Sequence, residues 1–163
     1  CSIEYNSFSF GIFNFSIILF SVALNNRYAS KGINSNALMP GGIITPIFKH
    51  MTKEERIQIG IMDENGNPVD NPRMKSTQQG ASTTVWACVA PELEGRGGLY
   101  FEDCQISSER SADDLKAEFF QSNTAPLPTG ICPHAKDEKL ADKLWDFSIK
   151  AILAYTILIL HTI

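Results

Sequence analysis

Cys132 and His134 come closest to a chemical site by type and spacing, because both residue types can bind zinc and they stand two positions apart. A closed structural zinc site needs four protein ligands, and no second pair with ligand-like spacing follows in the sequence. We therefore interpret Cys132 as a loop thiol beside a solvated imidazole, and we predict no metal site.

The four cysteines show no Cys-x-x-Cys spacing, and a chain of 163 residues needs no disulfides to hold a fold, so we expect reduced thiols in a cytoplasmic setting.

The richest glycine cluster of the chain is Gly95-Arg96-Gly97-Gly98. A glycine turn binds a pyrophosphate when it joins a strand to the N-terminus of a helix. This cluster instead precedes the apolar residues 99–101, which we expect to form a short buried strand, so we interpret it as a tight connection. Charge argues against nucleic acid as a partner, because 14 basic residues are scattered among 18 acidic ones and the formal net charge is -4.

The elements that would position functional residues alternate between helix and strand. Residues 19–31 combine good helix formers with polar residues at intervals, and Gly32 follows where a left-handed cap would end the helix. Residues 33–39 have the composition of a strand, although residues 34–36 are polar for a buried one. Pro40 and the two glycines after it would end this strand. A helix, a turn and a strand in this order are typical of an α/β domain.

Two capping boxes predict two further helices. Thr52–Glu55 has the required spacing and predicts a helix to about Met62, after which Asn65-Gly66 signals a turn. Ser76–Gln79 predicts a second helix, which Pro91 stops. The apolar residues that this second helix would place on one face are Ala81, Val85, Cys88 and Val89.

Two more helices are expected toward the C-terminus, at residues 112–120 and 136–150. In the second of them, Leu140, Leu144 and Phe147 would face inward. With 44% hydrophobic residues and a length within the usual range of a single domain, the chain has enough apolar side chains for one α/β core.

Both ends of the chain differ in composition from its middle. Residues 8–24 are nearly all apolar, but they lack helical periodicity at first and a basic flank, so neither a membrane helix nor a signal peptide is favoured. The chain begins with Cys1 rather than Met, so we expect further sequence upstream. We divide it into an atypical apolar segment at 1–17, a domain at 18–150 and an apolar tail at 151–163, which is too short to span a bilayer comfortably.

Four patches of sequence carry a family resemblance. They are Leu19-Phe20-Ser21-Val22-Ala23-Leu24, then Asn36-Ala37-Leu38-Met39-Pro40-Gly41-Gly42-Ile43-Ile44-Thr45, then Gln79-Gly80-Ala81 with Trp86-Ala87, and finally Pro91-Glu92-Leu93-Glu94-Gly95 with Gly97-Gly98-Leu99-Tyr100-Phe101. In this order and spacing, residues 19–147 resemble the C-terminal portion of the short-chain dehydrogenase/reductase family, in the branch of the retinol dehydrogenases and WW-domain oxidoreductases. The resemblance implies an α/β fold, the C-terminal part of a Rossmann-like doubly wound parallel sheet, which would be incomplete in this chain.

In that family, the Pro-Gly turn lies at the carboxyl end of a parallel strand and beside the nicotinamide, where ligands bind in open α/β sheets. The resemblance therefore implies cofactor contacts by Pro40, Gly41, Ile43 and Thr45. A glycine backbone can approach the ring closely, a main-chain amide and the Thr45 hydroxyl can hydrogen-bond a carboxamide, and Ile43 can pack on the edge of the ring. The alternative is an ordinary Pro-Gly turn that ends a strand, with Thr45 capping the next element of the chain.

Residues 46–75 correspond to the segment that covers the substrate in the family. Phe48 and Met51 are the substrate-binding candidates, and together with Ile57 and Ile61 they could line a lipophilic pocket. The same four residues could instead be the buried side of one short helix, and we favour this second interpretation.

The catalytic pair of the family is absent from the sequence. That pair is a Tyr with a Lys four residues later, which places both groups one turn apart on one face of a helix. None of the four tyrosines has a Lys four residues later, and counting back from residue 19 puts Phe10 and Asn14 at the two positions. Neither residue can transfer a proton in that role, so we predict no catalytic residue in this chain.

The resemblance and its departures predict part of an oxidoreductase that uses NAD or NADP and acts on an alcohol or carbonyl substrate. The chain would hold the nicotinamide-side turn, the substrate cover and the last helix and strand, and it would be inactive alone. Unpaired central strands would make the isolated chain poorly soluble or partly unfolded. The main alternative is a non-catalytic protein that associates with a membrane through its apolar ends or binds a partner. A third possibility is a pseudoenzyme that binds a dinucleotide or pairs with an intact relative, and the chain could also form a homo-oligomer.

Overall fold

The computed structural model describes residues 2–121 and 129–160, and these residues form two compact units. The first unit comprises Cys1–Ala37, Leu93–Tyr100 and Cys132–Ile163. The second unit comprises Leu38–Glu92 and Phe101–Ile131. Helices occur in both units, together with short strands, so the predicted α/β class is confirmed.

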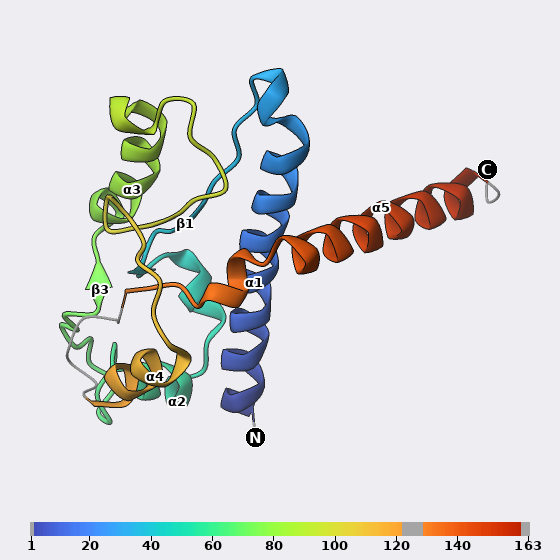
Figure 1. The fold of residues 1–163 in the computed structure, drawn as a ribbon. Helices are drawn as coiled ribbons and strands as arrows, with labels where there is room; N and C mark the ends of the chain where they lie inside the picture. The colour runs from blue at the N-terminus through green and yellow to red at the C-terminus, as the bar shows by residue number, and fades with distance from the viewer. Residues whose placement is uncertain (1, 122–128, 161–163) are drawn as a thin grey trace. The chain divides into compact units, whose positions relative to one another are not determined.

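Two long helices build the first unit, α1 at Ser2–Tyr28 and α5 at Glu138–Leu160 (Figure 1). The first turns of α5 pack against α1 through small and apolar side chains. Arg27 of α1 reinforces this contact, because its guanidinium lies 4.9 Å from the ring centroid of Trp145 and 2.7 Å from a carboxylate oxygen of Asp142. The core residues are Leu19, Val22, Ala23 and Ala141, with Phe15, Leu144 and Trp145 packed against them.

Helix α1 begins at Ser2, much earlier than the residue 19 that the sequence predicts. The absence of an amphipathic pattern misled the prediction, because a helix that is already nucleated propagates one hydrogen bond at a time without needing such a pattern. Residues 2–18 contain no proline, and Gly11 is their one glycine, so nothing in them stops propagation. The predicted end is confirmed, since Gly32 has a φ of 81° and its N–H donates to the carbonyl of Ala29 in the short 3-10 helix η1 at Ala29–Lys31.

Strand β1 covers only Ala37–Met39, so the predicted start at residue 33 is wrong. The polar residues before it hydrogen-bond elsewhere instead of joining the sheet. The backbone N–H of Ser35 donates to the side-chain oxygen of Asn25, and Asn36 uses its amide group to bind the carbonyl of Arg96 and the N–H of Leu99. These contacts anchor the loop before β1 to the glycine cluster, which confirms that residues 95–98 form a tight connection.

The second unit contains a parallel pair of strands, β2 at Gly42–Ile43 and β3 at Met74–Lys75. Both predicted capping boxes are present. Thr52 caps α2 at Lys53–Gln58, which ends earlier than the predicted Met62, and Ser76 caps α3 at Thr77–Val89 directly after β3 (Figure 1). The capping groups therefore fix where each helix begins, and they place α3 immediately beyond the end of β3.

A second sheet has the strand order β1-β4-β5, with β4 at Tyr100–Glu102 and β5 at Gln105–Ile106 paired antiparallel. Asp103 and Cys104 join β4 to β5 with φ values of 49° and 57°. Phe101 of β4 is fully buried and meets the ring of Trp86 on α3 edge to face at 5.3 Å. Helix α4 follows at Ala112–Gln121, close to its predicted range.

Several apolar side chains that the sequence groups on one face of a helix point outward. Val85 and Val89 of α3 are 58% and 69% exposed, whereas the same helix buries the small residues Gly80 and Thr83. Phe147 of α5 is 70% exposed, so its predicted inward position is wrong, and Leu140 is exposed as well. Only Leu144 of the predicted trio packs on the core of its unit. Helix α3 buries the face that carries small residues, because small residues let neighbouring elements pack closely. The hydrophobicity of the side chains alone does not identify this face.

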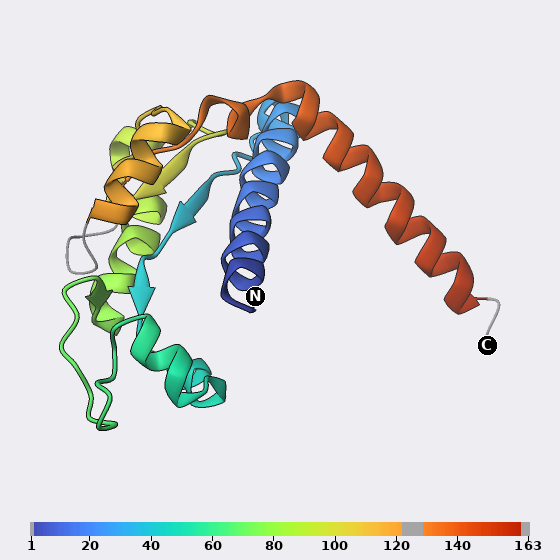
Figure 2. The same ribbon diagram turned by 90° about the horizontal axis from the view of Figure 1, so that it is seen from below.

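Helix α5 continues to Leu160, ten residues beyond the predicted end at residue 150, and it runs away from α1 after its first turns (Figure 2). The side chains of residues 151–155 are all exposed. Within the described ranges, no helix has the combination of length and apolarity needed to cross a membrane. The division into 1–17, 18–150 and 151–163 stays a prediction, and the helices α1 and α5 pass through its two boundaries without a break.

Candidate functional site

The Pro40-Gly41 turn lies in the second unit, where the chain leaves β1 and enters β2. Gly41 has a φ of 95°, a conformation that residues with a side chain rarely adopt. A Cβ atom built on Gly41 would lie 2.8 Å from Cδ and Cε of Lys75. The turn thus requires glycine for two separate reasons, the backbone conformation and the space that Lys75 occupies.

Ile43 stands in β2, opposite Lys75 in the parallel register, and its side chain lies against helix α3. A Cβ atom built on Gly80 would come within 2.2 Å of Cδ1 of Ile43. The Ile43 side chain therefore fills the space that the glycine of α3 leaves open. This contact fixes β2 against α3 immediately after the Pro40-Gly41 turn.

Thr45 occupies the N-cap position of the 3-10 helix η2 at Pro46–His50, with extended backbone. Its side chain makes no capping hydrogen bond, while its backbone carbonyl accepts the N–H of Phe48 at 3.0 Å. The hydroxyl of Thr45 is therefore not engaged in capping η2, although the residue stands where a cap would.

The two substrate-binding candidates sit on one short turn. Met51 is the C-cap residue that follows η2, and its N–H donates to the carbonyl of Phe48 at 3.1 Å. The same carbonyl accepts Nη2 of Arg56 at 2.9 Å, and Nε of Arg56 is buried with no hydrogen-bond partner among the described residues. Phe48, Met51 and Ile57 are half-buried, and Ile61 is buried. Backbone hydrogen bonds thus connect Thr45, Phe48 and Met51 in one stretch of chain.

Lys75 and Asp103 are residues of this site that the sequence analysis missed. Their side chains form an ion pair between β3 and the turn that joins β4 to β5. The two residues stand 28 positions apart, and no short-range pattern relates residues at that separation. Only the fold, which places Lys75 across from Ile43 and over Gly41, brings the pair to the turn.

The turn and the residue after β2 offer backbone groups and one hydroxyl rather than a phosphate-binding arrangement. Gly41 brings no side chain of its own to the carboxyl end of β1, although Lys75 covers one side of the turn, and Thr45 adds a hydroxyl that capping does not use. Nowhere in residues 2–121 and 129–160 does a glycine-rich turn join a strand to a helix, which is the arrangement that binds a pyrophosphate.

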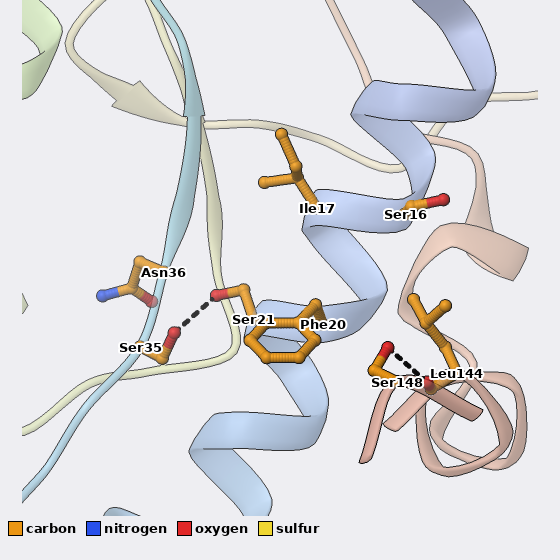
Figure 3. A pocket seen from close by; sticks show the side chains of 8 residues that line it. All are labelled: Ser16, Ile17, Phe20, Ser21, Ser35, Asn36, Leu144 and Ser148. Atoms are coloured by element: carbon orange, nitrogen blue, oxygen red, sulfur yellow. Dashed lines mark hydrogen bonds between the residues drawn. The ribbon is translucent and has the colours of Figure 1, made fainter. Parts of the chain in front are cut away.

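The first unit contains a separate pocket of about 370 Å³ between α1, the loop before β1, and α5 (Figure 3). Apolar walls come from Ile17, Phe20 and Leu144, and serine hydroxyls lie around them. Two of these hydroxyls, on Ser21 and Ser35, are 3.0 Å apart, and Ser148 donates to the carbonyl of Leu144 at 2.8 Å. None of the described residues that line the pocket is charged.

The remaining residues of chemical interest do not assemble into a catalytic group. Phe10 and Asn14 both lie within α1. His134 lies against Phe15 at 5.3 Å between ring centroids, and the described residues hold no cluster of three or more metal-ligating side chains.

Hydrogen bonds from Arg110 lower the pKa of Glu118, and those from Asn67 lower the pKa of Asp63, in both cases by stabilising the carboxylate.

Known proteins provide an independent comparison. No protein-family model and no solved structure matches the chain. It is 36% identical over 137 residues to a Streptomyces lividans protein named "Probable oxidoreductase", which covers 84% of this chain and 42% of that relative. It is 35% identical over 129 residues to a short-chain dehydrogenase/reductase of Penicillium roqueforti, covering 79% of this chain and 33% of the relative.

A third relative is the WW domain-containing oxidoreductase of Danio rerio, at 40% identity over 135 residues, covering 83% of this chain and 26% of the relative. The chain thus spans less than half the length of each of these relatives, while most of its own length is matched. The chain belongs to the short-chain dehydrogenase/reductase family.

Proposed function

We propose that this chain is the part of an NAD(P)-dependent oxidoreductase that presents the nicotinamide-side turn and the substrate cover, for a reaction on an alcohol or carbonyl. The observation that carries the proposal is the left-handed Gly41 at the carboxyl end of β1, followed by Thr45 with a hydroxyl that does not cap η2. Strand ends of this kind are where ligands bind in open α/β sheets. The names of the relatives support the same class of reaction.

Each proposed contact has a distinct task. The Gly41 backbone would approach the nicotinamide ring, the Thr45 hydroxyl would hydrogen-bond its carboxamide, and Pro40 and Ile43 would hold the turn and flank the ring. Phe48 and Met51 would cover the substrate from the turn that comes next in the chain. When bound, the cofactor would supply or accept a hydride, and these residues would hold and orient it.

Catalysis by this chain alone is not expected. The sequence has no Tyr with a Lys four residues later, and Phe10 and Asn14 stand at the corresponding positions of α1. The pyrophosphate arrangement is not formed by the described residues either. We therefore propose that the chain is inactive unless the rest of the domain is supplied.

The test compares three proteins by the absorbance of reduced nicotinamide, with NAD or NADP and a panel of primary and secondary alcohols. The proteins are the full chain, the chain with Phe10→Tyr and Asn14→Lys, and the Streptomyces lividans relative as a positive control. We expect turnover by the relative alone, because the double variant restores the proton-transfer pair without a pyrophosphate site. Turnover by the unmodified chain would overturn the proposed inactivity. Saturation-transfer NMR with NAD tests cofactor binding separately. Magnetisation transfer from the chain to the nicotinamide protons, weakened in Thr45→Val, would support the proposed contact.

A specific observation favours a second candidate function, attachment to a membrane or an apolar partner. Phe147, Ile152, Leu153 and Tyr155 of α5 are all more than half exposed. An apolar helix end of this kind is typical of surfaces that bind lipid or protein. Flotation with phosphatidylcholine vesicles tests this function, and a chain that stays at the bottom of the gradient argues against it.

A further inference from the structure

The side chain of Lys75 lies directly over the Gly41 turn. Its Cδ, Cε and Nζ atoms are 2.8 to 2.9 Å from the position that a Cβ atom on Gly41 would occupy. The parallel register brings the lysine there, since Lys75 of β3 is opposite Ile43 of β2. The lysine stem therefore covers one side of the turn.

A lysine stem is flexible and would ordinarily move away from a glycine without resistance. Here the ammonium group forms an ion pair with Asp103, which holds the far end of the side chain in place. Asp103 is itself constrained, because it has a φ of 49° and the next residue, Cys104, donates its N–H to the buried Thr83 hydroxyl of α3. The chain of contacts runs from α3 through the β4–β5 turn to Lys75 and ends on Gly41.

The pair contributes little to overall stability, so its role is local. The side chains of Lys75 and Asp103 are 27% and 49% exposed, and ion pairs with this much exposure to solvent contribute little to the stability of a fold. An interaction of that size cannot decide whether the unit folds. It can decide which of several orientations a flexible side chain adopts. The orientation of Lys75 in turn determines how much space the Gly41 turn has.

We propose that Lys75 is a positioning residue, and that its ion pair with Asp103 keeps the Gly41 turn in the left-handed conformation that presents its backbone to the nicotinamide. The cofactor part of this proposal rests on the proposed function. The geometric part, that Lys75 and Asp103 set the conformation of Gly41, stands without it.

The experiment measures the two three-bond couplings between the amide proton and the α protons of Gly41 in the full chain by NMR, because these couplings report φ. The variants are Lys75→Met, which keeps the stem and removes the charge, Asp103→Asn, and the exchanged pair Lys75→Asp with Asp103→Lys. The matched control is Arg110→Met, which removes the Arg110–Glu118 ion pair of the same unit at similar exposure. Lys75→Arg serves as the conservative variant that preserves the charge.

In the unmodified chain, we expect the two couplings of Gly41 to be unequal, because φ is fixed. In Lys75→Met and Asp103→Asn they should approach a common value as φ averages over several conformations, and in the exchanged pair they should differ again. Arg110→Met and Lys75→Arg should leave them unequal. The proposal is overturned if the Gly41 couplings are unchanged in Lys75→Met. It is also overturned if the couplings change as much in Arg110→Met, because that would indicate a general loss of order in the second unit. NAD affinity, measured by saturation-transfer NMR, should fall about three- to tenfold in Lys75→Met. If the unmodified chain shows no transfer from NAD, the proposed function fails while the couplings still decide the role of Lys75.

Discussion

The hydroxyl of Thr83 accepts a hydrogen bond from the backbone N–H of Cys104 at 3.2 Å, and through it a fully buried side chain of α3 holds a residue whose φ is 57°. Replacing Thr83 with Val keeps the shape of the side chain but removes the acceptor. Leaving a partly buried N–H unsatisfied costs about 1–3 kcal/mol, so amide exchange at Cys104 should accelerate roughly tenfold or more. Thr83→Ser keeps the hydroxyl, and exchange at Cys104 should stay within a few-fold of the unmodified rate.

The contact between Ile43 and Gly80 predicts an unusual response to alanine. Alanine in a helix is ordinarily favoured over glycine by about 1 kcal/mol, but a Cβ at position 80 would collide with Cδ1 and Cγ1 of Ile43. Gly80→Ala should therefore destabilise the unit by about 1–3 kcal/mol in urea titrations, because overpacking outweighs the gain in propensity. Adding Ile43→Ala removes both colliding atoms, and the double variant should be more stable than the sum of the two single changes. Additive effects would show that the contact is absent.

Asp63 should titrate below its ordinary pKa of 3.8, chiefly because the Asn67 side chain and then the Asn67 backbone N–H bind its carboxylate. A folded-state pKa that is lowered contributes stability above the unfolded value, and that contribution is lost as the pH falls through the folded value. Asn67→Ala should raise the pKa of Asp63 toward 3.8, as measured from its carboxyl carbon by NMR. Asn65→Ala keeps the backbone N–H groups of this turn and should leave the pKa nearly where it was.

The exposed apolar part of α5 should govern the solubility of the chain. Replacing Phe147 and Ile152 with Lys removes exposed apolar area without touching the core formed by Leu19, Val22, Ala23 and Ala141. We expect the double variant to elute as a smaller and more uniform species in size-exclusion chromatography. Leu144→Lys is the matched control, because Leu144 packs against that core, and this single change should unfold the first unit. An unchanged elution profile of the double variant would mean that other surfaces cause association.

The parts of the fold that depend on local chemistry could be predicted from the sequence. The caps at Thr52 and Ser76, the left-handed Gly32 and the turn at Asn65-Gly66 all follow from groups within four residues of one another. Such contacts form in the same way in any fold, so a sequence pattern is sufficient. The beginning of α1 could not be predicted in this way, because helix propagation leaves no periodic pattern in residues 2–18.

Contacts between distant residues limited the prediction of the site. The Pro40-Gly41 turn could be located from its residue types, and its conformation agrees with them. The sequence did not indicate that Ile43 lies on Gly80, nor that Lys75 pairs with Asp103, because strand register decides both. The outward positions of Val85 and Phe147 were also hidden, since a helix pattern identifies an apolar face but not whether the chain covers it.

The unbroken run of α1 from Ser2 to Tyr28 has a consequence for rebuilding the missing chemistry. A helix advances by about 100° per residue, so every side chain of a segment grafted ahead of Leu19 takes an azimuth fixed by its distance from that residue. Inserting one residue at the junction would rotate the whole graft by about 100°, and only steps of about seven residues restore its phase. A transplanted Tyr and Lys must therefore be matched to Leu19 in rotational phase as well as in sequence.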